Sequence, residues 1–230
     1  MKKYITIAAL LAAGSALVNA EEETLTLTSP AGGVLTSSNQ ALDWSQSYAE
    51  LKSWELSFTL TDAALKTGEN YSALFGTRQV GGVAGFSLRV NSNGSLEVYT
   101  YKTNTSGFAD TTVLTSGIWI TAGAPTDVSL RFIADVDDTD QILGGTFTLS
   151  SGADKTVSQK LEDNFAPVLG QTSLKKGSAS RLYTNGGQET FANITVKKLD
   201  NHAIPEPSTF GLLAGIGALA LVGTRRRKRA

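Results

Sequence analysis

Apolar and polar residues alternate over much of the chain between residues 24 and 200. In the clearest example, 54–61, every second residue is a large apolar one. Because successive side chains of a strand point to opposite faces, this period of two indicates a half-buried strand. The same pattern recurs at 24–28, 73–78, 85–90, 95–101, 113–121, 128–136, 142–149, 156–161 and 191–199. About ten short strands, with turn residues between them and next to no helical pattern, predict an all-β sandwich.

Turn signals join some of these runs into hairpins. Asn91-Ser92-Asn93-Gly94 lies between 85–90 and 95–101. An Asn-Gly pair between alternating runs is the strongest short-range hairpin signal, because both residues tolerate positive φ. A second hairpin is predicted around 150–154, which is rich in Ser and contains Gly.

The N-terminus has the three regions of a secretory signal peptide. Lys2 and Lys3 precede the apolar stretch 4–17, and Val18-Asn19-Ala20 supplies small side chains before an acidic start. We expect signal peptidase to cut after Ala20. Residues 1–20 are therefore predicted to be a signal peptide and the protein to be exported.

Three features follow one another at the C-terminus. Pro205-Glu206-Pro207 is rigid and extended, because proline fixes its own φ and disfavours helix in the residue before it. The apolar run 210–223 is shorter than the roughly 18–20 residues of a lone spanning helix. Five basic residues at 225–229 are typical of the cytoplasmic side of a membrane segment. A helix docked on the domain would be amphipathic, whereas this run is apolar on all sides, so we expect a short hydrophobic membrane helix.

This order of features resembles the PEP-CTERM protein-sorting signal, and residues 201–230 are expected to form a linker followed by that signal. The residues that carry the resemblance are Pro205, Glu206, Pro207, Arg225, Arg226 and Arg227. The resemblance implies an exosortase-type sorting enzyme as a partner. It also implies that the exported protein is anchored in the inner membrane before processing and then reaches the cell surface or the extracellular matrix.

The remaining residues, 21–200, have the size of one domain. The chain contains no Cys, so disulfides and thiolate metal sites are excluded. Its net charge is −1, but without Lys2, Lys3 and the five C-terminal bases, 13 basic residues stand against 21 acidic ones. So acidic a domain is not expected to bind nucleic acid through its phosphates.

The order of strands narrows the fold further. Trp54-Glu55-Leu56-Ser57-Phe58 forms an aromatic strand, a Gly-flanked hairpin lies mid-chain, and the last strand reads Phe191-Ala192-Asn193-Ile194-Thr195-Val196. This arrangement resembles the concanavalin A-like lectin and glucanase domains, including laminin-G-like modules. The resemblance implies a jelly-roll β-sandwich in which the first and last strands lie together in one sheet.

Few residues in the chain are suited to catalysis. The single His, His202, lies in the predicted linker, so neither a Ser-His-Asp triad nor a His-based metal site can form. Glucanases of the resembled fold share a Glu-x-Asp-x-Glu strand that places two carboxylates on one face. That spacing is absent here, although Glu55 lies where the first carboxylate would be. A carboxylate pair brought together from distant strands stays open, but we expect no enzymatic activity.

Asp135, Asp137, Asp138 and Asp140 form the one dense cluster of oxygen ligands. Four carboxylates at a strand end could bind a hard cation such as Ca²⁺. The cluster lacks the Gly and the distal Glu of an EF-hand loop. The alternative, and the favoured interpretation, is an acidic, solvated hairpin loop. We therefore expect no cofactor, with Ca²⁺ as the one possible exception.

Aromatic side chains are the candidate contacts for a glycan. Tyr99 and Tyr101 share one face of a predicted strand, opposite Val98, and are the best candidates for an outward pair. A core or cross-strand role is the more common alternative. The full set of candidate exposed aromatics is Trp44, Tyr48, Tyr71, Tyr99, Tyr101 and Trp119.

The sequence therefore predicts an exported, non-catalytic protein that binds a polysaccharide. A structural matrix component without a ligand pocket is the first alternative. A glycoside hydrolase, which needs two carboxylates roughly 5–10 Å apart in a groove, is the second.

Overall fold

The computed structural model describes residues 22–35, 39–61, 71–77, 84–102, 111–118, 120, 124–152, 155–161, 172–184 and 190–203. Within these ranges the chain forms strands and one short 3₁₀ turn, η1 (Ala31–Gly33), and no α-helix. The all-β prediction is confirmed. The predicted signal peptide and the apolar C-terminal helix lie outside the described residues.

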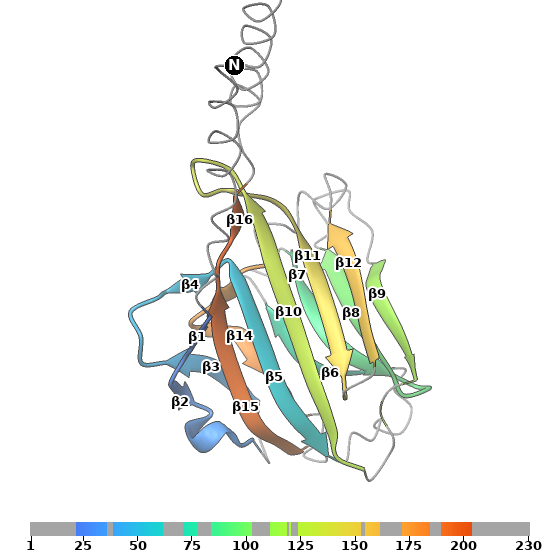
Figure 1. The fold of residues 1–230 in the computed structure, drawn as a ribbon. Coiled ribbons are helices and arrows are strands. Elements are labelled where there is room, and N and C mark those ends of the chain that lie inside the picture. Colours follow the sequence, from blue (N-terminus) through green and yellow to red (C-terminus); the bar gives the residue numbers. More distant parts are fainter. Residues whose placement is uncertain are drawn as a thin grey trace, which may run out of the picture.

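Two sheets make up most of the domain (Figure 1). The first, called sheet I, has the order β1-β15-β5-β10-β11-β12, and β16 pairs with β10 off this path. Its neighbouring strands are antiparallel except for β16, which is parallel to β10. The strands are β1 (Glu23–Thr24), β15 (Thr190–Leu199), β5 (Ser53–Thr61), β10 (Thr126–Val136), β11 (Ile142–Ser151), β12 (Lys155–Leu161) and β16 (His202–Ala203).

The second sheet, called sheet II, has the order β2-β3-β14-β6-β7-β8-β9. Its strands are β2 (Leu27–Ser29), β3 (Gln40–Trp44), β14 (Gly177–Leu182), β6 (Tyr71–Thr77), β7 (Ala84–Asn91), β8 (Ser95–Lys102) and β9 (Thr111–Ile118). A separate short pair joins β4 (Glu50–Leu51) to β13 (Leu174–Lys175). The chain changes sheets repeatedly, after β1, β3, β5, β9, β12 and β14, which gives the wrapped connections of a jelly-roll sandwich.

Both predicted hairpins are present. β7 and β8 pair around Asn91–Gly94, where Gly94 takes a φ of 79°. β11 and β12 pair around a turn in which Gly152 takes a φ of 63°. Positive φ at these turn positions is the conformation that glycine adopts without steric cost.

The predicted first strand, 24–28, is wrong as a single element. β1 pairs with β15 in sheet I, and the Leu25 amide still donates to Val196 O at 2.8 Å. β2 then pairs with β3 in sheet II, where Leu27 lies opposite Trp44. The alternation of Thr and Leu continues across the change of sheet, because both sheets cover the same core.

The last strand contains a β-bulge. Its buried residues Phe191, Ile194 and Val196 are spaced by three and then by two, and the register with β5 shifts between Ala192 and Thr195. Asn193, the residue in the bulge, takes a φ of 53°. The additional residue returns Ile194 to the core side, as bulges do when they re-aim side chains.

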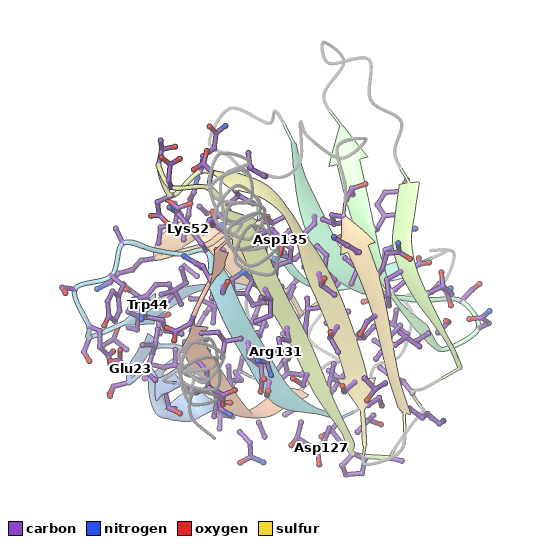
Figure 2. All side chains as sticks on the ribbon, turned by 45° about the horizontal axis from the view of Figure 1, so that its top comes forward. Glu23, Trp44, Lys52, Asp127, Arg131 and Asp135 are labelled. Atoms are coloured by element: carbon purple, nitrogen blue, oxygen red, sulfur yellow. The ribbon has the colours of Figure 1, made fainter. Side chains whose placement is uncertain are left out.

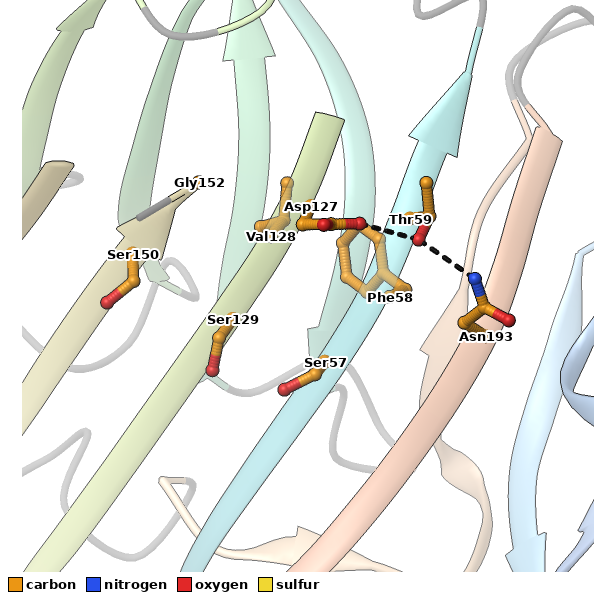
Figure 3. A pocket seen from close by; sticks show the side chains of 9 residues that line it. All are labelled: Ser57, Phe58, Thr59, Asp127, Val128, Ser129, Ser150, Gly152 and Asn193. Atoms are coloured by element: carbon orange, nitrogen blue, oxygen red, sulfur yellow. Dashed lines mark hydrogen bonds between the residues drawn. The ribbon is translucent and has the colours of Figure 1, made fainter. Parts of the chain in front are cut away.

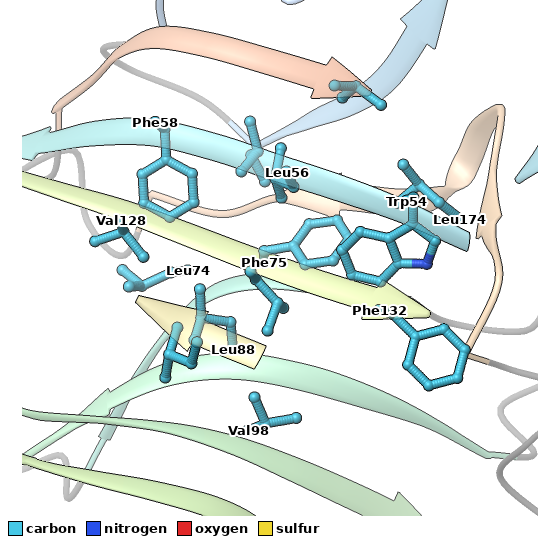
Figure 4. Close-up of a cluster of buried hydrophobic side chains, with 14 of the residues drawn as sticks. Trp54, Leu56, Phe58, Leu74, Phe75, Leu88, Val98, Val128, Phe132 and Leu174 are labelled. Atoms are coloured by element: carbon cyan, nitrogen blue, oxygen red, sulfur yellow. The ribbon is translucent and has the colours of Figure 1, made fainter. Parts of the chain in front are cut away.

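Aromatic rings fill the space between the sheets (Figure 4). Trp54 from β5 stacks on Phe86 of β7, with ring centroids 5.7 Å apart and 14° between the planes. Its indole N–H donates to Thr172 O at 2.8 Å. Phe75 and Phe147 meet the same indole edge-on. The contacts with Phe75 and Phe86 cross the core to sheet II, whereas Phe147 belongs to sheet I, so the indole links the two layers through Phe75 and Phe86.

Beyond Leu199 the chain remains attached to sheet I. β16 pairs with β10 at Asp135 and Val136, and the Asn201 amide side chain bonds to the Ser53 hydroxyl at 2.9 Å. The ordered contacts therefore continue to the point where the Pro-Glu-Pro segment begins.

A core glycine gives a direct test of the packing. Gly145 lies opposite Ala134, and a Cβ at Gly145 would meet the Phe132 ring and lie 2.6 Å from Ile133 O. Gly145→Ala should therefore lower the free energy of unfolding by about 1–3 kcal/mol, as overpacked cores do. The free energy of unfolding is measured by urea denaturation. Ser178→Ala, at an exposed site on β14, is the control and should change this free energy by less than about 0.5 kcal/mol. Equal stability of the two variants would contradict the packing.

Candidate functional site

Tyr99 lies on the outer face of sheet II. Its neighbours on β8, Val98 and Thr100, are buried, whereas the Tyr99 side chain is half-buried. The Arg89 guanidinium lies 3.5 Å above the centroid of the Tyr99 ring. Glu97 forms an ion pair with Arg89, and both of these side chains are largely buried. The tyrosine is thus held in place, and one of its two ring faces is covered by Arg89.

A transverse row of residues extends from Tyr99 across sheet II. Tyr99 lies opposite Ser87, Ser87 opposite Gly76, and Gly76 opposite Arg181. The ring of Tyr183 lies on the same face beside Gly76, where its Cε2 is 3.5 Å from the position of a Cβ, an ordinary van der Waals distance. We call Arg181, Tyr183, Ser87 and Tyr99 the tyrosine row. Its two phenol groups lie on one sheet face with an exposed guanidinium beside them.

Tyr183 and Arg181 were not among the residues predicted from the sequence. Arg181-Leu182-Tyr183 does alternate, with Leu182 fully buried, and this is the signal that could have identified them. The run is short, and its pairing with β6 is visible only in the structure.

The other candidate aromatics have different roles. Trp44 is fully buried, and its indole N–H donates to Tyr48 O at 2.9 Å. Tyr48 is half-buried; its hydroxyl donates to a Glu23 carboxylate oxygen at 2.8 Å, and Lys198 lies over its ring. Trp44 and Tyr48 therefore support the fold. The side chains of Tyr71 and Tyr101, and the whole of Trp119, lie outside the described residues.

The acidic cluster forms the loop between β10 and β11. One Asp137 carboxylate oxygen accepts hydrogen bonds from the Gln141 amide at 2.7 Å and from the Thr139 hydroxyl at 2.8 Å. These bonds, the one from Gln141 above all, hold the pKa of Asp137 below its ordinary value of 3.8. Asp140 forms an ion pair with Lys52 and accepts from the Asn201 amide at 3.4 Å.

These contacts keep the carboxylates of Asp137 and Asp140 engaged with the protein. Asp135 has a partner of its own, and Asp138 is exposed at the loop tip. Within the described ranges no three His, Cys, Asp or Glu side chains gather closely enough to hold a metal ion. Calcium binding at Asp135, Asp137, Asp138 and Asp140 stays a prediction, and the observed loop has the hydrogen bonds of a self-sufficient turn.

The outer face of sheet I carries a shallow depression that the sequence analysis did not predict. It has a volume of about 450 Å³ and lies over β15, β5, β10 and β11 (Figure 3). Polar groups dominate among the outward side chains. The lining residues are Ser57, Phe58, Thr59, Asp127, Val128, Ser129, Ser150, Gly152 and Asn193.

A cluster of ion pairs lies further along the same face. Lys197 Nζ contacts carboxylate oxygens of Glu22 at 3.2 Å and of Glu55 at 3.9 Å, and Arg131 contacts Glu22 at 3.7 Å. Figure 2 shows Asp127, Arg131 and Asp135 spaced along β10, with Asp127 at the end away from Lys52. None of the four residues of the ion cluster lines the depression.

A known protein-family profile matches the C-terminal signal. The profile of the PEP-CTERM protein-sorting motif matches residues 203–228. The chain carries this sorting motif. The motif indicates an exported, exosortase-processed protein, and it covers Pro205–Pro207 and Arg225–Arg227 as predicted. No curated protein sequence matches the chain.

Solved structures with a related shape include carbohydrate-binding modules and lyases. The CBM40 module of the Ruminococcus gnavus IT-sialidase, bound to α2,3-sialyllactose, is 12% identical, with a TM-score of 0.42 over 76% of this chain and 92% of its own. The CBM66 module of Bacillus subtilis is 8% identical, with a TM-score of 0.37 over 79% and 93%. An alginate lyase from a Chlorella virus is 7% identical, with a TM-score of 0.45 over 72% and 83%.

In the described part of the chain, no helix is long and apolar enough to span a membrane. The apolar run 210–223, predicted to form the membrane helix, lies outside that part.

The loop bonds of Asp137 predict a pH dependence. Because the folded-state pKa is lowered, the carboxylate stabilises the loop above its ordinary pKa of 3.8, and this contribution is lost as the pH falls through the lower folded value. An NMR titration of the Asp137 side-chain carbonyl carbon should show a midpoint below 3.8 in the folded protein. The same carbon in the urea-unfolded protein is the reference. A midpoint at or above 3.8 for Asp137 would contradict the hydrogen bonds to Gln141 and Thr139.

Proposed function

We propose that this protein is a non-catalytic, polysaccharide-binding component of the cell surface or extracellular matrix. Signal peptidase removes residues 1–20, the run 210–223 holds the exported chain in the inner membrane, and an exosortase-type enzyme then processes the sorting motif. The domain, residues 21–200, binds polysaccharide. Nucleic acid is not a partner, because acidic residues outnumber basic ones in it.

The observation that carries the binding proposal is the tyrosine row on sheet II. Tyr99 and Tyr183 offer apolar ring surface with a polar tip, and Arg181 and Ser87 offer hydrogen-bonding groups between and beside them. A few polar groups around aromatic surface are the usual composition of a small-molecule site. Arg89 and Glu97 fix the Tyr99 ring, so little conformational entropy is lost on binding.

The carboxylates on the outer faces of sheet I and sheet II support a function in binding and not in glycoside hydrolysis. Hydrolases need a pair of carboxyl groups on either side of the scissile bond. The depression on sheet I has one carboxylate among its lining residues, Asp127. Glu22 and Glu55, which share Lys197, lie in ion pairs outside it. On the outer face of sheet II, Glu97 is the carboxylate beside Tyr99, and it is bound to Arg89.

The sandwich is proposed to be of the concanavalin A-like type. The pairing of β1 with β15 supports this, because that type of domain is expected to have its first and last strands side by side in one sheet. A structural matrix component without a ligand is the competing function. It would leave the tyrosine row without a role beyond packing.

Sorting predicts a shortened mature protein. Intact mass spectrometry of the protein from its native host should show that residues 1–20 and the basic tail, Arg225–Arg229, are both missing. Replacing Pro205 and Pro207 by Ala should leave the basic tail in place, because the rigid strip is lost. A native mass that includes Arg225–Arg229 would contradict processing.

Glycan binding predicts a loss of affinity when the tyrosine row is cut back. The secreted protein should bind a subset of a glycan array, and Tyr99→Ala and Tyr183→Ala should each weaken binding about tenfold or more, which corresponds to roughly 1.4 kcal/mol. Ser178→Ala, exposed on neighbouring β14, should bind like the parent. Unchanged binding by both tyrosine variants, or no binding by the parent, would favour the structural alternative.

A further inference from the structure

The depression on sheet I is built from side chains that arrive in register. Ser57 lies opposite Ser129 on β10, which lies opposite Ser150 on β11, and on the other side Ser57 faces Thr195. Because neighbouring strands are about 4.8 Å apart, these hydroxyls form an evenly spaced row across four strands. The alternate residues of β10, Val128 and Leu130, are buried, so the row points to solvent.

A hydrogen-bond relay organises one end of this row. The bulge in β15 turns the Asn193 amide toward β5, where its nitrogen donates to Thr59 Oγ1 at 3.1 Å. Thr59 in turn donates to Asp127 Oδ1 at 2.7 Å (Figure 3). The Gly152 amide donates to the Asp127 carbonyl at 3.0 Å and ties the β11–β12 turn to the same residue.

Several hydrogen-bond acceptors in the depression remain available to a ligand. Asp127 Oδ2, Asn193 Oδ1 and the Ser129 hydroxyl have no hydrogen bond to any residue that the structure describes. Asn193 reaches this position through a left-handed backbone conformation, with a φ of 53°. Asparagine adopts this conformation more readily than most residues, and β-bulges are over-represented next to active sites, where they re-aim a side chain.

The chemistry of the lining defines the ligand class. A carboxylate oxygen, an amide oxygen and hydroxyls suit a ligand with several hydroxyl donors on adjacent carbons. The lining residues include one negative charge, Asp127, and no Lys or Arg. Arg131 and Lys197, which lie along the same face, are in ion pairs with Glu22, and Lys197 also contacts Glu55. A uronate, sulfate or phosphate would therefore be repelled, and a neutral sugar accepted.

We propose that this depression is a second saccharide site, specific for neutral sugars. It lies on the opposite face of the sandwich from the tyrosine row, because the outer faces of two packed sheets point away from each other. One molecule then bridges two polysaccharide chains. This bridging rests on the proposed function of the tyrosine row, whereas binding in the depression stands without it.

Binding in the depression is tested on an array of neutral glucose-, mannose- and galactose-based hexasaccharides, with hexagalacturonate as the acidic probe. Asp127→Ala should weaken binding of the secreted protein to at least one neutral probe about tenfold or more. Thr146→Ala, on the same sheet face but outside the depression, is the matched control. Asp127→Asn should narrow the preference for neutral over acidic probes, because it removes the repelling charge. If Asp127→Ala binds every neutral probe like the parent, the site does not exist.

Bridging is tested by the turbidity of a soluble neutral polysaccharide that the parent binds. The parent should cross-link it, and Asp127→Ala and Tyr183→Ala should each stop cross-linking while each retains binding at the other face. If Tyr183→Ala binds and cross-links the polysaccharide like the parent while Asp127→Ala loses binding, the depression is a binding site and the tyrosine row is not. Cross-linking that persists in Asp127→Ala overturns the bridging proposal.

Discussion

The structure depends on how Trp54 joins the two sheets. The indole comes from β5, the strand between β15 and β10 in sheet I, and its ring stacks on Phe86 and meets Phe75 edge-on, both from sheet II. Its N–H bonds to Thr172 O, so the polar atom of a fully buried side chain is satisfied. Phe132 and Phe147 from sheet I close the same aromatic cluster. Trp54 and its aromatic neighbours belong to one hydrophobic core between the sheets, and polar residues occupy most outward positions of β5 and β10.

The outer faces are consequently polar in two different ways. On sheet I the outward residues of β5, β10 and β11 are mainly Ser, Thr and charged residues, and they form a hydroxyl row beside an ion cluster. Among the described side chains on the outer side of sheet II are Tyr99, Tyr183, Arg89 and Arg181, and Glu97 forms an ion pair with Arg89. Since a strand alternates between core and solvent, every outward position on these strands is free of the core and can be given to recognition.

One of the two candidate sites relies on a local exception to regular strand geometry. The bulge in β15 brings Asn193 to Thr59 and also returns Ile194 to the core. On sheet II the regular register aligns Arg181 with Tyr99, and the Tyr183 ring lies at van der Waals distance from the Cβ position of Gly76. The acidic loop differs, because its hydrogen bonds and its ion pair with Lys52 are all directed within the protein.

The sequence by itself determined the strands that alternate strongly, the two hairpins and the sorting motif, because these depend on neighbouring residues along the chain. It did not reveal β3 or β14, whose runs are short, nor the change of sheet between β1 and β2, since alternation is the same whichever sheet covers the core. The row from Arg181 to Tyr99 and the relay from Asn193 to Asp127 join residues far apart in the chain. Only the tertiary structure decided these, because strand order and register are set by how the two sheets fit around Trp54.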